Sequence, residues 1–174
     1  MSSTYYIDGY NVLYQSSVLR PLAVKDFEAA RDALIEKVAG FCVALNAHAV
    51  IVFDGRGEQR HPERAVPKTL VKGLEILYSP ADLSADAVIE RMIYKAGNRL
   101  DFVVVSNDRS LRDLCRNLGA LTMEADNFLE SVRETRAGTS QVLKNLEKAS
   151  APAHLEDRLD SKTLDQLRKL REQL

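Results

Sequence analysis

Short apolar runs that alternate with helical patterns constrain the fold of this chain most strongly. Three clear runs lie at residues 5–7 (YYI), 49–53 (AVIVF) and 102–105 (FVVV), and two weaker ones lie at residues 74–78 (LEILY) and 120–123 (ALTM). A continuous apolar run is typical of a strand that is covered on both faces, as in a parallel sheet, whereas a strand with one wet face alternates polar and apolar residues. The runs therefore predict buried strands.

Helical patterns occupy the segments between these runs. The clearest spans residues 26–45, another starts at Ser84 as the expected N-cap, and a third covers residues 111–118. Parallel strands need long crossover connections, which are usually helices. We therefore predict an α/β fold over residues 1–136, with a doubly wound, mainly parallel sheet flanked by helices.

Residues 137–174 predict a helical C-terminal extension. The stretch VLKNLEKA (142–149) is expected to form a short helix, and a hinge is expected near residues 150–153 because Pro152 disfavours helix at the residue before it. The last segment carries a leucine stripe that we expect to pack on the parent domain, and binding of a partner or of a second copy of the chain is the alternative. The stripe consists of Leu164, Leu167, Leu170 and Leu174.

Charge and composition exclude several classes of protein. The formal charge is −1, from 24 Lys and Arg against 25 Asp and Glu, so any site that binds nucleic acid must be local. No apolar run approaches the roughly 20 residues of a membrane helix, and the N-terminus lacks the basic and apolar regions of a secretory signal, so we expect a cytoplasmic protein with no membrane partner. Cys42 and Cys115 lie in apolar helical patterns and are expected to be core residues.

Aspartates follow the predicted strands at the points where ligands bind. Asp8 follows the first strand, Asp54 the second, and Asp108 comes shortly after the strand at residues 102–105. In an open parallel sheet, ligands sit at the carboxyl ends of the strands. Asp86 and Glu90 join them from the first two turns of the helix that starts at Ser84, on one helical face. Each aspartate alone could equally be a turn or N-cap residue.

Together, these carboxylates predict a metal site. Crowded carboxylates raise one another's pKa or need a cation, and oxygen ligands without His or Cys suit Mg²⁺ or Mn²⁺. We expect Asp8, Asp54, Asp86, Asp108 and Glu90 as ligands. Gly9 is expected to allow a tight turn, and Asn11 either holds a water or a phosphate oxygen or caps the next turn.

The chain resembles a known nuclease family in four motifs, which occur in the order IDGYNV (7–12), VFDG (52–55), SADAVIE (84–90) and VVSNDRSLRDLCRNLGA (104–120). Over about residues 4–134 it is similar to the NYN domain in its YacP-like branch, within the PIN-like group. The resemblance implies a Rossmann-like PIN fold and a metal-dependent endoribonuclease. It also implies an acidic pocket built from Asp8, Asp54, Asp86 and Asp108, with Asn11 as a signature residue. The run VSND departs from the VATSD-like run of the branch. The aspartate is kept at Asp108, but the resemblance does not extend to a hydroxyl contact beside it.

The expected reaction is hydrolysis of RNA, with Asp8, Asp86 and Asp108 as catalytic residues that anchor one or two Mg²⁺ or Mn²⁺ ions. Attack by a metal-bound water leaves 5′-phosphate and 3′-hydroxyl ends. Single-stranded RNA such as mRNA is the expected substrate, and the relatives suggest the ribosome as a second partner. The rival hypothesis is a non-catalytic PIN-like module that binds RNA or protein and keeps a structural Mg²⁺.

Candidate contacts to RNA lie next to the acidic motifs. The basic segment at residues 56–72 offers phosphate-binding side chains, and Arg109 starts a basic stripe on the predicted helix that follows Asp108. Tyr10 and Tyr14 could stack on bases, or they could belong to the core. The basic segment contributes Arg56, Arg60, Arg64, Lys68 and Lys72. Oligomeric state is not decided by these patterns.

Overall fold

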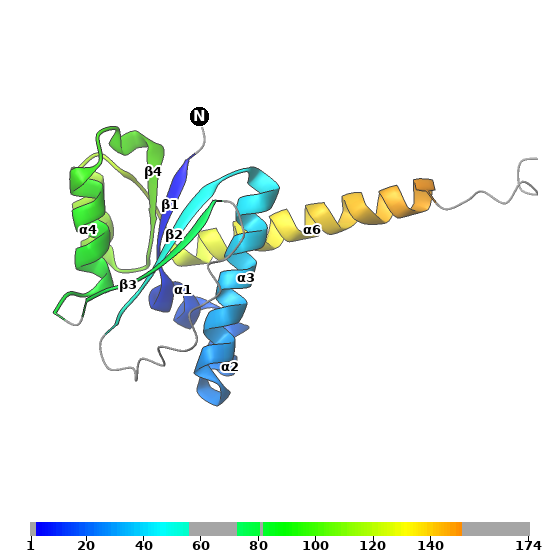
Figure 1. Cartoon of the computed structure of the whole chain (residues 1–174), viewed down its shortest axis with the longest axis horizontal. Coiled ribbons are helices and arrows are strands. Elements are labelled where there is room, and N and C mark those ends of the chain that lie inside the picture. The colour runs from blue at the N-terminus through cyan, green and yellow to red at the C-terminus, as the bar shows by residue number, and fades with distance from the viewer. Residues whose placement is uncertain (1–2, 56–72, 81, 151–174) are drawn as a thin grey trace, which may run out of the picture. The chain divides into compact units, whose positions relative to one another are not determined.

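A computed structural model describes residues 3–55, 73–80 and 82–150 of the chain. Its centre is a parallel sheet in the order β3-β2-β1-β4-β5 (Figure 1). The strands are β1 (Thr4–Asp8), β2 (His48–Phe53), β3 (Leu74–Tyr78), β4 (Phe102–Val105) and β5 (Leu121–Met123). Each predicted strand is present, so the predicted α/β class with a parallel sheet is confirmed.

Most of the helices lie between strands in the sequence, and several of them begin at polar caps. They are α1 (Gly9–Gln15), α2 (Leu19–Lys25), α3 (Phe27–Leu45), α4 (Ala85–Lys95), α5 (Arg109–Asn117) and α6 (Ala125–Ser150), with a 3-10 turn at Arg99–Asp101. Asp26 accepts a hydrogen bond from the Ala29 N–H at 2.9 Å, and Ser84 accepts one from the Ala87 N–H at 3.2 Å. Both side chains satisfy N–H groups that a helix start leaves unpaired.

Both faces of the sheet are buried, and successive residues of each strand alternate between them. On one face Ile7 and Ile51 pack with residues of α3 and with Phe128 of α6. On the other face Tyr6 and Val50 pack with residues of α4 and α5. This arrangement explains why the central strands read as continuous apolar runs. Cys42 and Cys115 are buried and free, one in each of these clusters, as expected for core residues.

The order of the strands sets the location of the site. The chain passes from β1 outward through β2 to β3 and then returns to β4 on the other side of β1. The direction of winding therefore changes at β1, and the carboxyl end of β1 is the switch point where ligands bind in such sheets. Asp8 is the last residue of β1.

Two features differ from the sequence prediction. Helices α1 and α2 have seven residues each, which is too short for a clear helical period, and they were not predicted. Helix α6 runs without interruption through Gly138 to Ser150, so VLKNLEKA is not a separate short helix. The chain divides into units at residues 1–138 and 139–174. The hinge beyond Ser150 and the leucine stripe lie outside the described residues.

No helix in the described part of the chain is long and apolar enough to cross a membrane.

Candidate functional site

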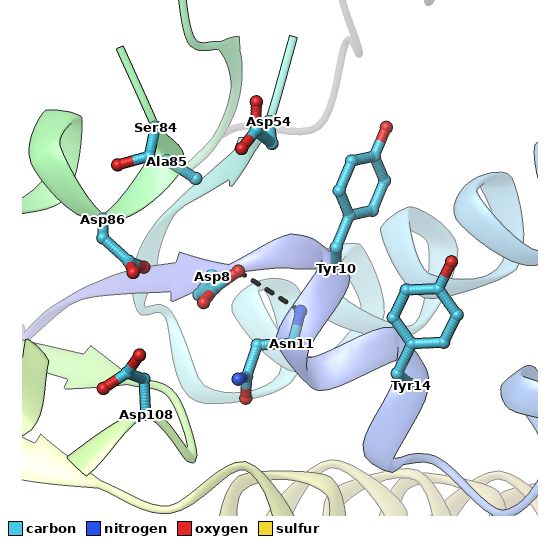
Figure 2. Close-up of a pocket in the computed structure, with 9 residues that line it drawn as sticks. All are labelled: Asp8, Tyr10, Asn11, Tyr14, Asp54, Ser84, Ala85, Asp86 and Asp108. Atoms are coloured by element: carbon cyan, nitrogen blue, oxygen red, sulfur yellow. Dashed lines mark hydrogen bonds between the residues drawn. The ribbon is translucent and has the colours of Figure 1, made fainter. Parts of the chain in front are cut away.

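The predicted aspartates meet in one open cavity of about 280 Å³. Asp8, Asp54 and Asp108 reach it from the ends of the adjacent strands β1, β2 and β4, and Asp86 reaches it from the first turn of α4 (Figure 2). The lining residues are Asp8, Tyr10, Asn11, Tyr14, Asp54, Ser84, Ala85, Asp86 and Asp108. The sequence prediction that four distant carboxylates share one edge of the sheet is therefore correct.

Asp8 is the most buried carboxylate of the site, with 8% of its surface exposed. Its Oδ1 accepts a hydrogen bond from the Asn11 N–H at 3.2 Å, which caps α1, and its Oδ2 accepts one from the Ser106 hydroxyl at 3.2 Å. The pKa of Asp8 is raised to about 6, mainly by burial and also by the negative charge of Asp86, while the hydrogen bonds from Asn11 and Ser106 act to lower it. The group is thus held in place and is costly to ionise.

The pKa of Asp86 is raised as well. Burial raises its pKa first, and the negative charges of Asp108 and Asp54 add to the effect. Figure 2 shows its carboxyl group and that of Asp8 pointing toward one another, and the interaction between the two groups raises the pKa of Asp8. Two facing carboxyl groups share a proton or require a cation.

Ser106 connects two of the carboxylates and was not identified from the sequence. It is fully buried at the end of β4, donates its hydroxyl hydrogen to Asp8 Oδ2, and accepts a hydrogen bond from the Asp108 N–H at 3.0 Å. Asp108 in turn caps α5, because its Oδ1 accepts from the Ser110 N–H at 2.7 Å and from the Leu111 N–H at 3.2 Å. The VSND run therefore does supply a hydroxyl contact beside the aspartate. In the sequence, the sign of this contact was a serine directly after the apolar run at residues 102–105.

Asp54 is positioned by a second buried serine. The Ser79 hydroxyl donates to Asp54 Oδ1 at 3.5 Å and accepts from the Gly55 N–H at 3.0 Å. A side chain at residue 55 would meet the Ser79 carbonyl oxygen at 2.2 Å, so the close approach requires glycine. Ser79 follows β3 and is 3% exposed, and it too was missed from the sequence.

Gly9 lets helix α1 pack closely on β2. It is the first residue of α1, and a Cβ there would lie 2.4 Å from Phe53 Cε1 and 3.0 Å from Ile51 Cγ2. The chain passes from β1 into α1 at Gly9 without a loop, and the role expected for Gly9 in a tight turn stays a prediction.

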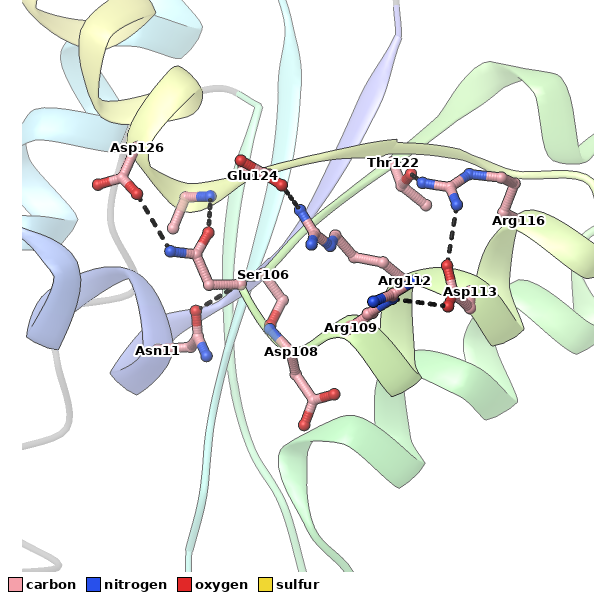
Figure 3. Close-up of polar contacts among 12 residues, drawn as sticks. Asn11, Ser106, Asp108, Arg109, Arg112, Asp113, Arg116, Thr122, Glu124 and Asp126 are labelled. Atoms are coloured by element: carbon pink, nitrogen blue, oxygen red, sulfur yellow. Dashed lines mark hydrogen bonds and ion pairs between the residues drawn. The ribbon is translucent and has the colours of Figure 1, made fainter.

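Asn11 holds the loop that carries Asp108. Its Oδ1 accepts a hydrogen bond from the Asn107 N–H at 2.7 Å (Figure 3). Asn107 extends the network, since its Oδ1 accepts from the Ala125 N–H at 2.7 Å and its Nδ2 donates to Asp126 at 3.2 Å. The side-chain oxygen of Asn11 is therefore used by the Asn107 N–H. A contact from the side-chain nitrogen, Nδ2, to water or phosphate stays a prediction.

The chemistry of the site fits a hard divalent cation. Of the nine described residues that line the cavity, none is Lys or Arg, while four are aspartates with oxygen donors. Among the described residues, no group of three or more His, Cys, Asp or Glu side chains is placed around a single ion position. Mg²⁺ commonly keeps several waters and takes only one or two carboxylates, so a looser arrangement than a closed cage fits it.

The remaining predicted residues differ in whether they line the cavity. Glu90 is exposed one turn further along α4 and is not among the lining residues. The Arg109 side chain is 88% exposed and pairs with Asp113 at 3.6 Å, also outside the lining. Tyr10 and Tyr14 do line the cavity. The predicted phosphate contacts Arg56, Arg60, Arg64 and Lys68 lie outside the described residues.

Comparisons with known proteins agree with these motifs. The YacP-like NYN domain matches residues 5–172, beyond the 4–134 of the motif resemblance. The YacP protein of Bacillus subtilis (strain 168), described as uncharacterized, is 27% identical over 136 residues, which cover 72% of each chain. Two crystal structures of Rae1 (YacP) from Bacillus subtilis share the fold at 21% identity. For one of them the TM-score is 0.71, and the match covers 99% of this chain and 95% of the Rae1 chain. For the other, a point mutant, the TM-score is 0.69, and the match covers 90% of this chain and 89% of the Rae1 chain. With its four motifs and its acidic cavity in place, the chain belongs to the YacP-like NYN domain family.

Proposed function

We propose that this protein is a Mg²⁺- or Mn²⁺-dependent endoribonuclease. The NYN family is a nuclease-type family, which supports an RNA-related nuclease role. The observation that carries the proposal is the meeting of Asp8, Asp54, Asp86 and Asp108 in one cavity at the switch point of the sheet. Four acidic groups, with no basic residue among the described residues of the lining, favour a bound cation rather than an internal ion pair.

Asp8, Asp86 and Asp108 would hold the cation, with Asp54 at the edge of the same cavity. When bound, the ion would lower the pKa of a water for attack on the phosphodiester and neutralise the phosphate. The products would be RNA fragments with 5′-phosphate and 3′-hydroxyl ends.

The chain itself orients these acidic groups. Asn11 N–H and the Ser106 hydroxyl fix both oxygens of Asp8, and the backbone at the start of α5 fixes Asp108. Such fixed donors reduce the freedom of the ligands before RNA arrives. Because the pKa of Asp8 is raised to about 6, its ionised form predominates only above that pH.

RNA is the proposed partner, and single-stranded RNA such as mRNA is the proposed substrate. Arg109 and the basic segment at residues 56–72 are the candidate phosphate contacts. Cleavage on the ribosome and a cytoplasmic location belong to the same proposal.

A non-catalytic module with a structural Mg²⁺ is the second candidate. The observation behind it is that the described carboxylates do not surround a single ion position, and so do not by themselves define a catalytic metal centre. Cleavage of single-stranded RNA with Mg²⁺ or Mn²⁺ tests the two candidates, with Asp8→Asn and Asp86→Asn as site variants. Asp32→Asn is the matched control, because Asp32 is an exposed aspartate of α3 that does not line the cavity.

A further inference from the structure

The cavity has one aromatic wall beside its carboxylates. Tyr10 and Tyr14 are one helical turn apart on α1 and both line the cavity, and Figure 2 shows their rings on the α1 side of it. Residues four positions apart on a helix lie on the same face, so α1 presents two rings to the site.

The two tyrosines are not equivalent. The Tyr10 ring is braced on two sides, with centroids 5.2 Å from Phe27 and 5.0 Å from Phe53, and it is half-buried. Tyr14 meets Phe27 at 6.5 Å with the ring planes at 37°, and 52% of its surface is exposed. Tyr10 is therefore largely a core residue, whereas Tyr14 offers open ring surface at the cavity.

The charge of the cavity favours a neutral contact to the base. The lining has four aspartates and, among the described residues, no Lys or Arg, so its own charges repel a polyanion. A cation can hold the phosphate at the carboxylates, but it does not hold the neighbouring base. An exposed aromatic ring binds the face of a base without charge, and it accepts any base because every base has a π-face.

We propose that Tyr14 stacks on an unpaired base of the nucleotide next to the phosphate in the acidic cavity. This inference rests on the proposed function, since RNA is the ligand. A base inside a duplex is already covered by its neighbours, so Tyr14 selects unpaired nucleotides. Purines stack more strongly than pyrimidines because their ring surface is larger, so the site favours a purine at that position.

The test is RNA binding measured by fluorescence anisotropy, with Ca²⁺ in place of Mg²⁺. The probes are a labelled 12-nucleotide oligoadenylate, an oligouridylate of the same length, and a 12-base-pair RNA duplex. The variants are Tyr14→Leu, which removes the ring, Tyr14→Phe, which keeps it, and Tyr94→Leu as the matched control. Tyr94 is a tyrosine of α4 that is 66% exposed and does not line the cavity.

Tyr14→Leu is expected to weaken oligoadenylate binding by about 5- to 100-fold, the range in which loss of a stacking ring acts. The loss should be smaller for oligouridylate and absent for the duplex. The affinity of Tyr14→Phe for oligoadenylate should fall by less than about twofold, and Tyr94→Leu should bind it as the parent does. The ratio of oligoadenylate to duplex affinity is read within each variant, so a partly unfolded sample does not alter it.

Equal ratios in Tyr14→Leu and the parent would overturn the stacking role, even if both proteins cleave RNA. Loss of oligoadenylate binding in Tyr14→Leu without any RNA cleavage by the parent would keep the stacking role and remove the nuclease proposal. A parent that binds none of the three RNAs would overturn both.

Discussion

The hydroxyl of Ser106 donates a hydrogen bond to Oδ2 of Asp8 at 3.2 Å, across 98 positions of the sequence. This contact ties the ends of the adjacent strands β1 and β4 together at the switch point of the sheet. It also favours the ionised form of Asp8, which burial disfavours. The acidic site is thus held by a neutral residue that is not itself a candidate ligand.

Ser106→Ala is expected to lower the free energy of unfolding by about 1–3 kcal/mol, because the buried Asp8 carboxyl loses a hydrogen-bond donor and the partly buried Asp108 N–H loses its acceptor. It should also raise the pKa of Asp8, so the acid limb of any pH–activity profile moves to higher pH. Urea unfolding and the pH profile measure the two effects. Ser110→Ala serves as control, since Ser110 is exposed. Unchanged stability together with an unchanged profile would contradict the positioning role.

Asp8→Asn is expected to change stability in a pH-dependent way. The folded pKa of Asp8 is about 6 and the ordinary value is 3.8, so the folded state binds the proton more tightly and the parent loses stability as pH rises between them. Over this pH range the free energy of unfolding of the parent falls by about 3 kcal/mol. Asparagine carries no charge, so Asp8→Asn does not show this fall. Relative to the parent, Asp8→Asn should gain stability from about pH 4 to about pH 7 in urea unfolding without divalent cations. A difference that stays constant over this range contradicts the raised pKa.

Gly9→Ala is expected to destabilise the fold by about 1–3 kcal/mol, because the new methyl group would overlap the ring of Phe53. Gly40→Ala is the matched comparison, since nothing lies within 4 Å of its Cβ position in the middle of α3. That substitution should stabilise the protein by about 0.5–1 kcal/mol through helix propensity. The measurement is the midpoint temperature of thermal unfolding of the two variants and the parent. Similar midpoints for Gly9→Ala and Gly40→Ala would argue against close packing at Gly9.

Asn107→Ala is expected to loosen the loop between β4 and α5. The variant leaves the Ala125 N–H without its acceptor and removes the contact to Asp126, at a cost of about 1–3 kcal/mol. If the network positions Asp108, RNA cleavage should fall as well. Asn127→Ala, at an exposed position of α6, should leave both quantities near parent values. Reduced stability with full cleavage would limit Asn107 to a structural role.

The sheet was predictable because its central strands are buried on both faces. Ile7 and Tyr6 face opposite layers, so each strand must be apolar throughout, and that pattern is legible in the sequence. Helices α1 and α2 were missed because seven residues give no clear period. The course of α6 beyond Gly138 was misjudged because a single exposed glycine is tolerated inside a helix.

The acidic site was predictable only in part. Asp8, Asp54 and Asp108 could be placed because each follows a strand, and Asp86 because it follows an N-cap. Glu90 was expected in the site from its helical face, yet α4 starts at the cavity, so one more turn carries Glu90 out of the lining.

The serines of the site escaped prediction for a different reason. Their contacts join strands that are distant in the sequence, as between Ser106 and Asp8 or between Ser79 and Asp54. A serine directly after an apolar run marks the position of Ser106, but only the arrangement of the strands in the sheet reveals which residue it contacts.

RNA cleavage by matched aspartate variants tests the central claim most directly. A 5′-labelled single-stranded RNA is incubated with the parent, Asp8→Asn, Asp86→Asn and Asp32→Asn, with Mg²⁺, with Mn²⁺ or with a chelator. We expect cleavage by the parent and Asp32→Asn only when a divalent cation is present, with a 3′-hydroxyl on the labelled upstream fragment. The two cavity variants should lose at least about 100-fold in rate, since each removes a charge at the cation site. Equal cleavage by all four proteins, cleavage in the chelator, or a 2′,3′-cyclic phosphate product would contradict the account.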